Sequence, residues 1–466
     1  MSNKLIIQNC ISQLILDSES IHNSIWEALR FRKKGYFHIG SYKLYRRTSG
    51  QKGWDGFTEF YSKITGKFPT GILPEVVKAL NVLNLKVEID DQRSPEIDLD
   101  HISENIFNDQ GITLYDYQVE IVNSIWKSQR GIIKAATASG KTLMFTALVK
   151  SIPPKTPALI LFRSRGLVRQ TYEIFKQNGI ENLGRIYSGC FEPNSILLTT
   201  IQSKANYLSL LDKFEVLIVD ESHEFSTPKS IEFFKKMKKC RYRFGFSATP
   251  WPKGDIVRKY QAKSWFGPVL ANIETKELQD KGRLSKSDCY FHKIEKPYEI
   301  ALLDYNSAYQ KGVVENPYLH KKINEIIDKY KTGRILIIVE KLPHGEALHA
   351  LIRNSIWVSG ADSDETRDYA IKKLRESAPD EKVVVIASRI MQTGVDVFVH
   401  ALINAAGYQS DIMTIQRKGR GLRLAPDKEK LDYHDFYYTN NSYLEKHSKE
   451  RIKHLKAEGH EIQIVN

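Results

Sequence analysis

One segment of the chain joins a short apolar run to a loop of small residues that ends in Gly-Lys-Thr. It extends from Ile132 to Thr142 and reads Ile-Ile-Lys-Ala-Ala-Thr-Ala-Ser-Gly-Lys-Thr. An apolar strand that feeds such a loop, followed by a helix beginning near Thr142, presents a concave set of backbone N–H donors that suits a polyphosphate. Lys141 would then contact the β- and γ-phosphates, and the Thr142 hydroxyl would bind Mg²⁺. Considered alone, the segment could also be an ordinary strand-to-helix turn.

A second apolar run ends in two adjacent carboxylates. Val216–Val219 is followed directly by Asp220, Glu221, Ser222 and His223. Because open parallel sheets bind ligands at the carboxyl ends of their strands, Asp220 is placed to hold Mg²⁺, directly or through water. Glu221 is placed to polarise the water that attacks the γ-phosphate. A solvated strand end is the alternative, but it is less common for four such residues behind an apolar run.

Six further segments surround these two elements. In chain order they are Leu114–Gln118, Phe162–Gln170, Leu198–Ser203, Phe246–Pro250, Ala387–Asp396 and Gln416–Arg423. Taken singly, Ser-Ala-Thr-Pro could be a loop, and Arg420 and Arg423 could form one basic helix face. In this order, however, the whole set resembles the motifs of superfamily 2 helicases and translocases. The resemblance implies an α/β chain with two tandem RecA-like parallel-sheet lobes that close on ATP.

The resemblance also implies a role for each motif residue. Nucleotide binding is expected, with Gln118 as the adenine reader, from Tyr115, Gln118, Thr137, Ala138, Ser139, Gly140, Lys141, Thr142, Gly394 and Asp396. Catalysis is expected from Lys141, Asp220, Glu221 and two arginine fingers of the second lobe, Arg420 and Arg423. Such fingers are worth ~10³–10⁵ in rate in related enzymes. Mg²⁺ would be held by Thr142 and Asp220. Coupling of the nucleotide state to nucleic acid is expected from His223, Ser247, Thr249 and Gln416, and phosphate contacts from Arg163, Ser164, Thr200, Gln202 and Ser388.

Two positions depart from the pattern of this superfamily. Ala138 stands where many members carry glycine, and alanine costs about 1 kcal/mol if that position needs a positive φ. We therefore expect a slightly altered loop that still binds ATP. Tyr115-Asp116 replaces the more usual Arg-Pro or Arg-Asp, which leaves open whether Tyr115 stacks on the adenine.

The charge and composition of the chain limit which classes of binding partner, cellular location and metal are expected. Lys and Arg outnumber Asp and Glu by 69 to 55, which gives a net charge of +14 and favours a polyanionic partner over a membrane. No stretch approaches 18 uninterrupted apolar residues, and the N-terminal segment is a poor signal peptide, so we expect a cytoplasmic protein, in the host cytoplasm if a phage encodes it. The four cysteines are far apart without a C-x-x-C pair, which indicates free thiols. Mg²⁺ with ATP is the one metal expected.

The length of 466 residues allows about three domains. We expect a small α+β nucleic-acid-binding domain at 1–100, a first lobe at 101–276, a second lobe at 277–445 and a helical tail at 446–466. Strands are expected in the lobes at Ala158–Phe162, Ile196–Thr200, Val216–Asp220, Arg334–Val339, Val383–Ala387 and Ala401–Ala405, with a helix at Asp364–Glu376. Leu278–Tyr298 is expected to bridge the lobes, and Glu445–Glu461 to form a solvated helix rather than a DNA arm.

In the N-terminal region, before the two expected lobes, the apolar patterns that predict helices and strands are shorter. Helices are expected at Asn9–Arg32 and Glu75–Leu83, strands at Tyr36–His38, Tyr42–Tyr45 and Thr58–Tyr61, a turn at Ser49–Gly53, and an acidic linker at Glu88–Asp100. Between residues 28 and 67, ten basic residues oppose only Asp55 and Glu59 and alternate with aromatic ones. This mixture is typical of a surface that tracks phosphates and stacks on bases, with Arg46, Arg47, Lys52 and Trp54 as candidates. A solvated basic face over an ordinary aromatic core, with Trp54 inside it, is the alternative.

Two short segments in this region carry a further resemblance. Lys52–Gly56 and Gly66–Leu73 are similar to the small N-terminal domain of phage UvsW-type recombination helicases. The resemblance implies a domain that engages duplex or branched DNA. The leading hypothesis is therefore an ATP-dependent DNA helicase or translocase that unwinds or branch-migrates forked and junction DNA in replication, recombination or repair. It would act as a monomer with no obligatory protein partner. An RNA helicase, and a nucleic-acid clamp that binds ATP without hydrolysing it, are the alternatives.

Overall fold

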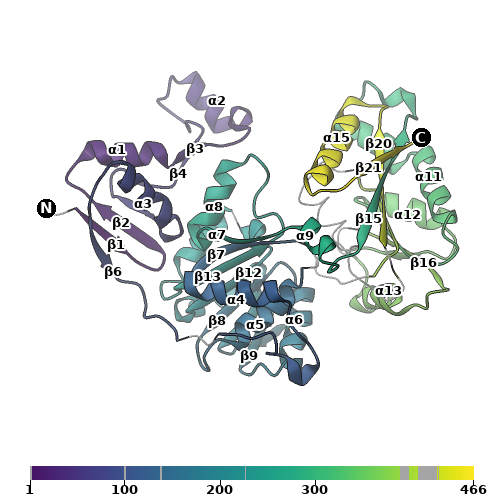
Figure 1. Cartoon of the computed structure of the whole chain (residues 1–466). Helices are drawn as coiled ribbons and strands as arrows, with labels where there is room; N and C mark the ends of the chain where they lie inside the picture. Colours follow the sequence, from purple (N-terminus) through teal and green to yellow (C-terminus); the bar gives the residue numbers. More distant parts are fainter. Residues whose placement is uncertain are drawn as a thin grey trace. The chain divides into compact units, whose positions relative to one another are not determined.

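The computed structural model describes residues 3–98, 101–136, 139–225, 227–388, 398–407, 428 and 430–466. They fold into two compact units (Figure 1). The first comprises Met1–Ala135 and Gly140–Asn272, and the second comprises Ala136–Ser139 and Ile273–Asn466. Within the described residues, no helix has the length and apolar content needed to cross a membrane. The expected four-part division of the chain stays a prediction, although its boundary at residue 276 lies close to the start of the second unit.

The main sheet of the first unit has eight strands in the order β10-β9-β11-β8-β12-β13-β7-β14. These are β7 (Arg130–Ala135), β8 (Ala158–Phe162), β9 (Leu183–Tyr187), β10 (Cys190–Glu192), β11 (Ile196–Thr200), β12 (Val216–Asp220), β13 (Tyr242–Ser247) and β14 (Val269–Ile273). From β9 to β7 every neighbouring pair is parallel. β8 and β12 are buried at every position, as expected for apolar runs in a parallel sheet that is covered on both faces. The helices of this part are α4 (Asp116–Ser128), α5 (Lys141–Lys150), α6 (Arg165–Gln177), α7 (Pro228–Lys235) and α8 (Ile256–Phe266).

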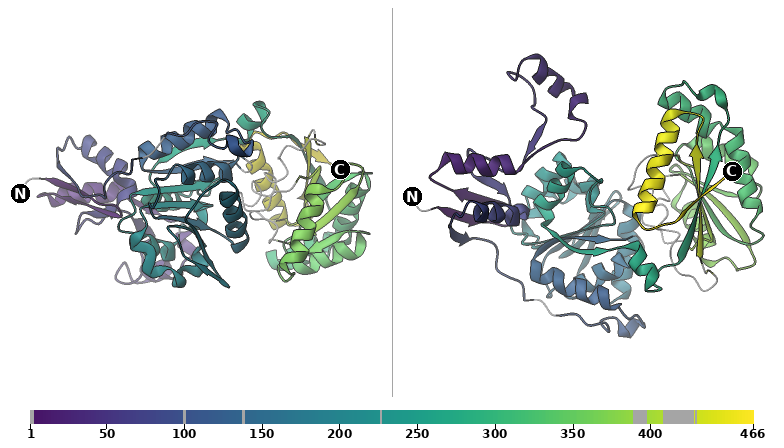
Figure 2. Two further views of the ribbon diagram at one scale, coloured as in Figure 1. Left: turned by 90° about the horizontal axis from the view of Figure 1, so that it is seen from below. Right: turned by 45° about the horizontal axis from the view of Figure 1, so that its top comes forward.

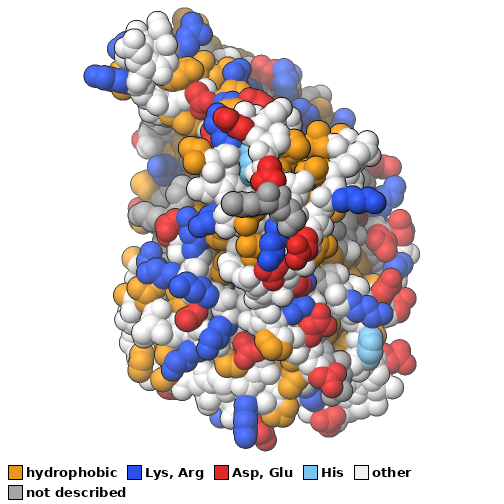
Figure 3. Space-filling view, turned by 90° about the vertical axis from the view of Figure 1, so that its left-hand side faces the viewer, with side chains coloured by type: hydrophobic (Ala, Val, Ile, Leu, Met, Phe, Trp, Pro, Cys, Tyr) orange, Lys and Arg blue, Asp and Glu red, His pale blue; other side chains and the backbone are white. Residues whose placement is uncertain are grey.

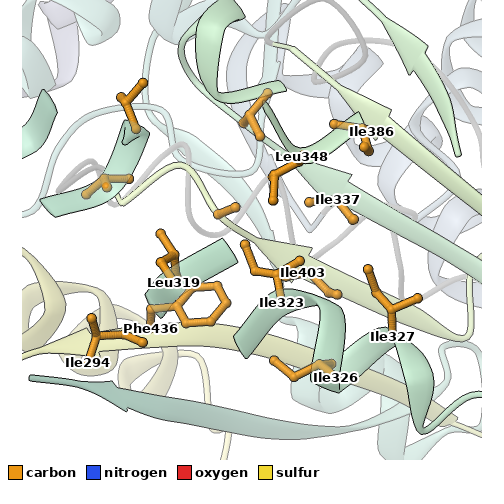
Figure 4. Close-up of a cluster of buried hydrophobic side chains, with 14 of the residues drawn as sticks. Ile294, Leu319, Ile323, Ile326, Ile327, Ile337, Leu348, Ile386, Ile403 and Phe436 are labelled. Atoms are coloured by element: carbon orange, nitrogen blue, oxygen red, sulfur yellow. The ribbon is translucent and has the colours of Figure 1, made fainter. Parts of the chain in front are cut away.

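The sheet of the second unit has seven strands in the order β17-β18-β16-β19-β20-β15-β21, and all of its pairs are parallel. These are β15 (Lys286–Ile294), β16 (Gly333–Ile338), β17 (Ile356–Val358), β18 (Lys382–Ala387), β19 (Ala401–Asn404), β20 (Lys430–Tyr438) and β21 (Ile462–Val465). Helices α9 (Thr275–Asp280), α10 (Tyr305–Tyr309), α11 (Pro317–Asp328), α12 (Leu342–Leu351), α13 (Asp364–Glu376) and α15 (Ser442–Ala457) accompany them. Figure 4 shows Ile323, Ile337 and Ile403 meeting in its core. The predicted pair of parallel-sheet lobes is confirmed.

The N-terminal part of the first unit mixes short helices and strands, as predicted. Its elements are β1 (Lys4–Ile7), β2 (Ile11–Ile15), α1 (Glu19–Ala28), β3 (Arg30–Arg32), α2 (Gly40–Arg47), β4 (Phe57–Glu59), β5 (Lys67–Pro69), α3 (Leu73–Val82) and β6 (Glu88–Asp91). Four strands form a sheet in the order β5-β2-β1-β6, and β3 pairs with β4. Leu5, Leu14, Ile25, Phe68 and Val76 form the centre of its core.

Three of the N-terminal predictions are wrong. Tyr36–His38 is a short 3₁₀ helix instead of a strand. Ile11–Ile15 is a strand instead of the start of a helix, and its buried face carries Ser12, which bonds Thr70 Oγ1 at 2.9 Å. A buried serine hides the alternation of a strand, so the apolar residues alone also fit a helical period. The region of Tyr42 and Tyr45 is helix α2 instead of a strand, since these rings lie three residues apart and stack at 6.3 Å on one helix face.

Two segments expected outside the sheets belong to them, and the terminal helix is less exposed than expected. The acidic run begins as β6, an edge strand parallel to β1, where Lys4 pairs with Asp90 at 3.0 Å. The expected bridge between the lobes contains β15, which lies between β20 and β21 in the second sheet. The terminal helix α15 is anchored to the second unit by its buried Leu444, Arg451 and Leu455, so it is not fully solvated.

Helix α8 joins the N-terminal part to the first lobe (Figure 2). Val257 belongs to the N-terminal core, whereas Trp265 and Phe266 belong to the core of the lobe. Gly71 lies so close to the helix that a Cβ atom there would clash with the carbonyl oxygens of Lys263 and Ser264. One helix therefore serves two cores.

Candidate functional site

The predicted site residues of the first unit follow strands that are neighbours in the sheet. β11, β8, β12, β13 and β7 lie side by side and parallel, so their carboxyl ends form one edge. Thr200, Arg163, Asp220, Ser247 and Lys141 lie at or just after these ends, in that order. Parallel sheets bind their ligands at this edge. The fold thus brings together residues as far apart in the sequence as Lys141 and Ser247.

The end of the small-residue loop is set by Gly140. It has φ of +81° and caps the N-terminus of α5, whose first residue is Lys141. A Cβ atom at Gly140 would clash with the Nε2 atom of Gln118, so both the backbone and the space require glycine. Gln118 is buried, and its Oε1 atom accepts a hydrogen bond from the Tyr115 N–H at 2.9 Å. The N-terminus of α5 and the segment that contains Tyr115 and Gln118 are therefore in contact.

Lys141 and Glu221 face each other across this edge. Lys141 Nζ lies 3.7 Å from Glu221 Oε1 and donates to the Ala135 carbonyl oxygen at 3.4 Å. Glu221 has φ of +50°, a conformation that non-glycine residues adopt at a cost and that is concentrated at functional sites. A lysine at a helix N-terminus beside a held carboxylate can bind a phosphate next to a general base.

Asp220 has the properties of a cation ligand. Its side chain is buried, and its Oδ1 atom has no hydrogen-bond partner among the described residues. Burial, and then the neighbouring Glu221 carboxylate, raise the pKa of Asp220 to about 7. A buried carboxylate with a spare oxygen is the kind of hard donor that Mg²⁺ prefers, and the predicted second ligand, the Thr142 hydroxyl, is of the same kind. The residues present therefore fit the predicted metal.

His223 connects the acidic pair with the Ser-Ala-Thr segment. Its Nδ1 atom lies 2.9 Å from Ser247 Oγ and 3.3 Å from Glu221 Oε2, and Ser247 Oγ donates to the same carboxylate at 3.3 Å. The Thr249 N–H donates to Ser247 Oγ at 3.1 Å. Burial alone would lower the pKa of His223, but its hydrogen bonds to Glu221 and Glu224 outweigh burial and raise it to about 9. His223 is therefore an imidazolium at neutral pH.

The predicted nucleic-acid contacts of the first unit follow β8 and β11. Ser164 caps α6 by accepting a bond from the Leu167 N–H at 3.4 Å. Thr200 Oγ1 lies 3.1 Å from Ser203 Oγ, and Gln202 is exposed beside it. In the second unit, the N–H of Ser388 donates to the carbonyl oxygen of Val358 at 3.0 Å, directly after β18. Their contacts with nucleic acid stay a prediction.

The N-terminal candidates divide into exposed and anchored residues. Arg46, Arg47 and Lys52 are exposed on α2 and the turn after it. Trp54 is half-buried, and its Nε1–H donates to the Phe57 carbonyl oxygen at 2.5 Å. Arg30 lies between the rings of Trp26 and Phe57 and pairs with Asp55, so part of the basic excess is internal. Figure 3 shows basic and acidic side chains interspersed on this face.

Several predicted residues lie outside the described ones. They are Thr137, Ala138, Gly394, Asp396, Gln416, Arg420 and Arg423. Sequence reasoning missed Glu224, which pairs with both His223 and Arg163. The signal that could have found it is a third carboxylate directly after the Asp-Glu-Ser-His segment.

The chain is similar to several known proteins. A family model described as "Type III restriction enzyme, res subunit" matches residues 111–251. "Putative helicase 22" of Sulfolobus islandicus filamentous virus is 23% identical over 393 residues, which cover 75% of this chain and 68% of the relative. The structure of Saccharomyces cerevisiae Dbp5 bound to RNA and ADP BeF3 has a TM-score of 0.57 at 18% identity, covering 78% of this chain and 92% of that one. That of T4 UvsW has a TM-score of 0.47 at 18% identity, covering both chains fully. The resemblance of this chain to superfamily 2 helicases, predicted from its motifs, is confirmed.

Proposed function

We propose that the chain is an ATP-dependent DNA helicase or translocase that unwinds or branch-migrates forked and junction DNA. The observation that carries the proposal is the meeting of Lys141, Asp220, Glu221 and His223 at the edge where Arg163 also lies. A phosphate-binding lysine, a buried cation ligand and a held general base are the parts that nucleotide hydrolysis requires. We propose that Arg163, next to them, binds nucleic acid within reach of the same network.

The proposed chemistry assigns one task to each group. Lys141 and the N-terminus of α5 bind the β- and γ-phosphates. Asp220 and Thr142 hold Mg²⁺, which supplies charge neutralisation on the phosphates when bound. Glu221 accepts the proton of the attacking water. The orientation of the Glu221 carboxylate is fixed by its contacts with Lys141, Ser247 and His223. Arg420 and Arg423 are proposed as the arginine fingers that complete the site.

DNA is favoured over RNA by three features. The net charge of +14 suits either polymer, but Lys52–Gly56 and Gly66–Leu73 resemble the N-terminal domain of UvsW-type DNA helicases. The acidic motif reads Asp-Glu-Ser-His instead of Asp-Glu-Ala-Asp. The N-terminal part is also packed on the first lobe through α8, where it can present DNA to the motor. A protein that binds ATP without turnover would need neither the general base proposed at Glu221 nor the arginine fingers proposed at Arg420 and Arg423.

The experiment compares ATP hydrolysis by the full chain with single-stranded DNA, forked DNA and RNA. We expect the largest stimulation with forked DNA, and stimulation by RNA alone would overturn the choice of DNA. The Glu221→Gln variant is expected to bind ATP and DNA while losing phosphate release. Branch migration of a four-way junction, compared with unwinding of a tailed duplex, then separates remodelling from plain strand separation.

A further inference from the structure

Arg163, the predicted phosphate contact after β8, is already paired with a carboxylate. Its Nη1 atom lies 3.1 Å from Glu224 Oε1, and the two side chains are 37% and 40% exposed. Exposed ion pairs of this kind are weak because water and salt screen them. An anion that arrives at Arg163 can therefore displace Glu224 easily.

Glu224 has a second partner on its buried side. His223 Nε2 lies 3.5 Å from the same Oε1 atom, and the other nitrogen of the ring reaches Glu221 and Ser247. The hydrogen bond from His223, more than the effect of Arg163, lowers the pKa of Glu224 despite its burial, so the carboxylate is charged. An unbroken chain of charged contacts thus runs from Arg163 to Glu221.

His223 is shared between two carboxylates at its two nitrogens. The two carboxylates attract the imidazolium in opposite directions. A change in the charge next to Glu224 therefore changes how strongly Glu224 attracts the ring away from Glu221. While Arg163 neutralises Glu224, the ring remains on Glu221 and occupies the Oε2 atom that would accept a proton. When Arg163 leaves, His223 is the cationic partner that Glu224 keeps among the described residues, and Glu224 attracts it more strongly.

We propose that Glu224 is a positioning residue through which a nucleic-acid phosphate bound at Arg163 releases Glu221 for catalysis. The inference rests on the proposed function, because it assigns the regulation of that same site. The phosphate exchanges with Glu224 on Arg163, Glu224 draws the imidazolium toward its Nε2 side, and Glu221 becomes able to accept the proton of water. The resting ion pair keeps hydrolysis slow until nucleic acid is bound.

The test measures kcat for ATP with and without saturating single-stranded DNA, and the DNA concentration that gives half of the stimulation. Arg163→Ala removes the resting partner of Glu224, so basal kcat is expected to rise about fivefold or more, the lower range of ordinary couplings between sites. Saturating DNA should add little to it. Arg163→Lys keeps the cation and should restore both the low basal rate and the stimulation.

Glu224→Gln gives the opposite result. Basal kcat should stay low and DNA should no longer raise it. The DNA concentration that half-saturates binding, measured for this variant by direct titration of labelled single-stranded DNA, should stay the same or fall because Arg163 has lost its competitor. The double variant should behave like Glu224→Gln, since the rise caused by Arg163→Ala needs the carboxylate. Arg185→Ala is the matched control, because it removes an exposed Arg–Glu pair of the same sheet, at 2.8 Å from Glu192. It should change neither rate.

Two results separate the inference from the proposed function. If Arg163→Ala leaves basal kcat unchanged and only raises the half-saturating DNA concentration, Arg163 is a simple phosphate contact and the inference is overturned. The proposed function then still stands. If the unchanged protein hydrolyses ATP without any response to DNA or RNA, the proposed function fails and the inference fails with it.

Discussion

Arg451 and Asp435 form a fully buried ion pair in the second unit, and breaking it should be costly. Both side chains are 0% exposed. Arg451 Nε donates to both carboxylate oxygens at 3.1 Å, and its Nη2 atom donates to Oδ1 at 2.9 Å. Arg451→Met would leave the Asp435 charge buried without a cation, which costs about 3–5 kcal/mol. Asn404 and Tyr433 still donate to Asp435, so we expect the lower part of that range.

The assay is hydrogen exchange of the amides of β20 and α15, because a chain of two units does not unfold in a single step. Lys449→Met is the control, since it removes an exposed pair with Glu445 from the same helix and should change exchange little. Arg451→Met combined with Asp435→Asn removes the stranded charge and keeps an acceptor for Asn404 and Tyr433. The double variant should recover more than half of the loss. Equal exchange in Arg451→Met and Lys449→Met would refute the reasoning.

Three further predictions concern the first unit. Glu221→Gln should lower kcat by about 10²–10⁴ with nearly unchanged ATP affinity, measured by phosphate release and nucleotide titration, and unchanged hydrolysis would exclude Glu221 as the base. His223 has a pKa raised to about 9, so its contribution to the free energy of unfolding is complete below its ordinary value near 6.5 and is lost as the pH rises through about 9. Melting curves of the protein and of His223→Gln across that range should converge at high pH. Gly140→Ala combines a positive φ with a clash at Gln118 and should destabilise the loop by about 1 kcal/mol or more and raise the KM for ATP, whereas an unchanged KM would contradict that geometry.

The lobes could be predicted from the sequence because their strands are continuous apolar runs, which are stable only when a parallel sheet buries them on both faces. Ala158–Phe162 and Val216–Asp220 are strands with the expected bounds. The helix at Asp364–Glu376 also has the bounds expected for it. The carboxyl ends of parallel strands then place Lys141 and Asp220 at one edge without further information. This part of the site follows from chain order and sheet geometry alone.

The remainder depends on contacts that no short pattern contains. Ser12 is buried because Thr70, in the short 3₁₀ helix after β5, supplies its hydrogen bond, and this pairing hid the strand at Ile11–Ile15. In the sequence, Arg451 looks like the other basic residues of the terminal helix, which are expected in solvent. Only the fold shows that it is buried opposite Asp435. The pairing of Glu224 could not be predicted for the same reason. Its partner Arg163 is distant in the sequence and comes close only because β8 and β12 are neighbours in the sheet.

Helix α8 sets a condition on how such a protein can be rearranged. A chain shortened to begin near Ile102 would expose Val257 and Tyr260 to water, because both pack on the N-terminal core. The first lobe would then lose the outer support of the helix that holds Trp265 and Phe266 in its own core. An exchange of N-terminal domains between related motors would therefore have to bring a matching α8 with the domain.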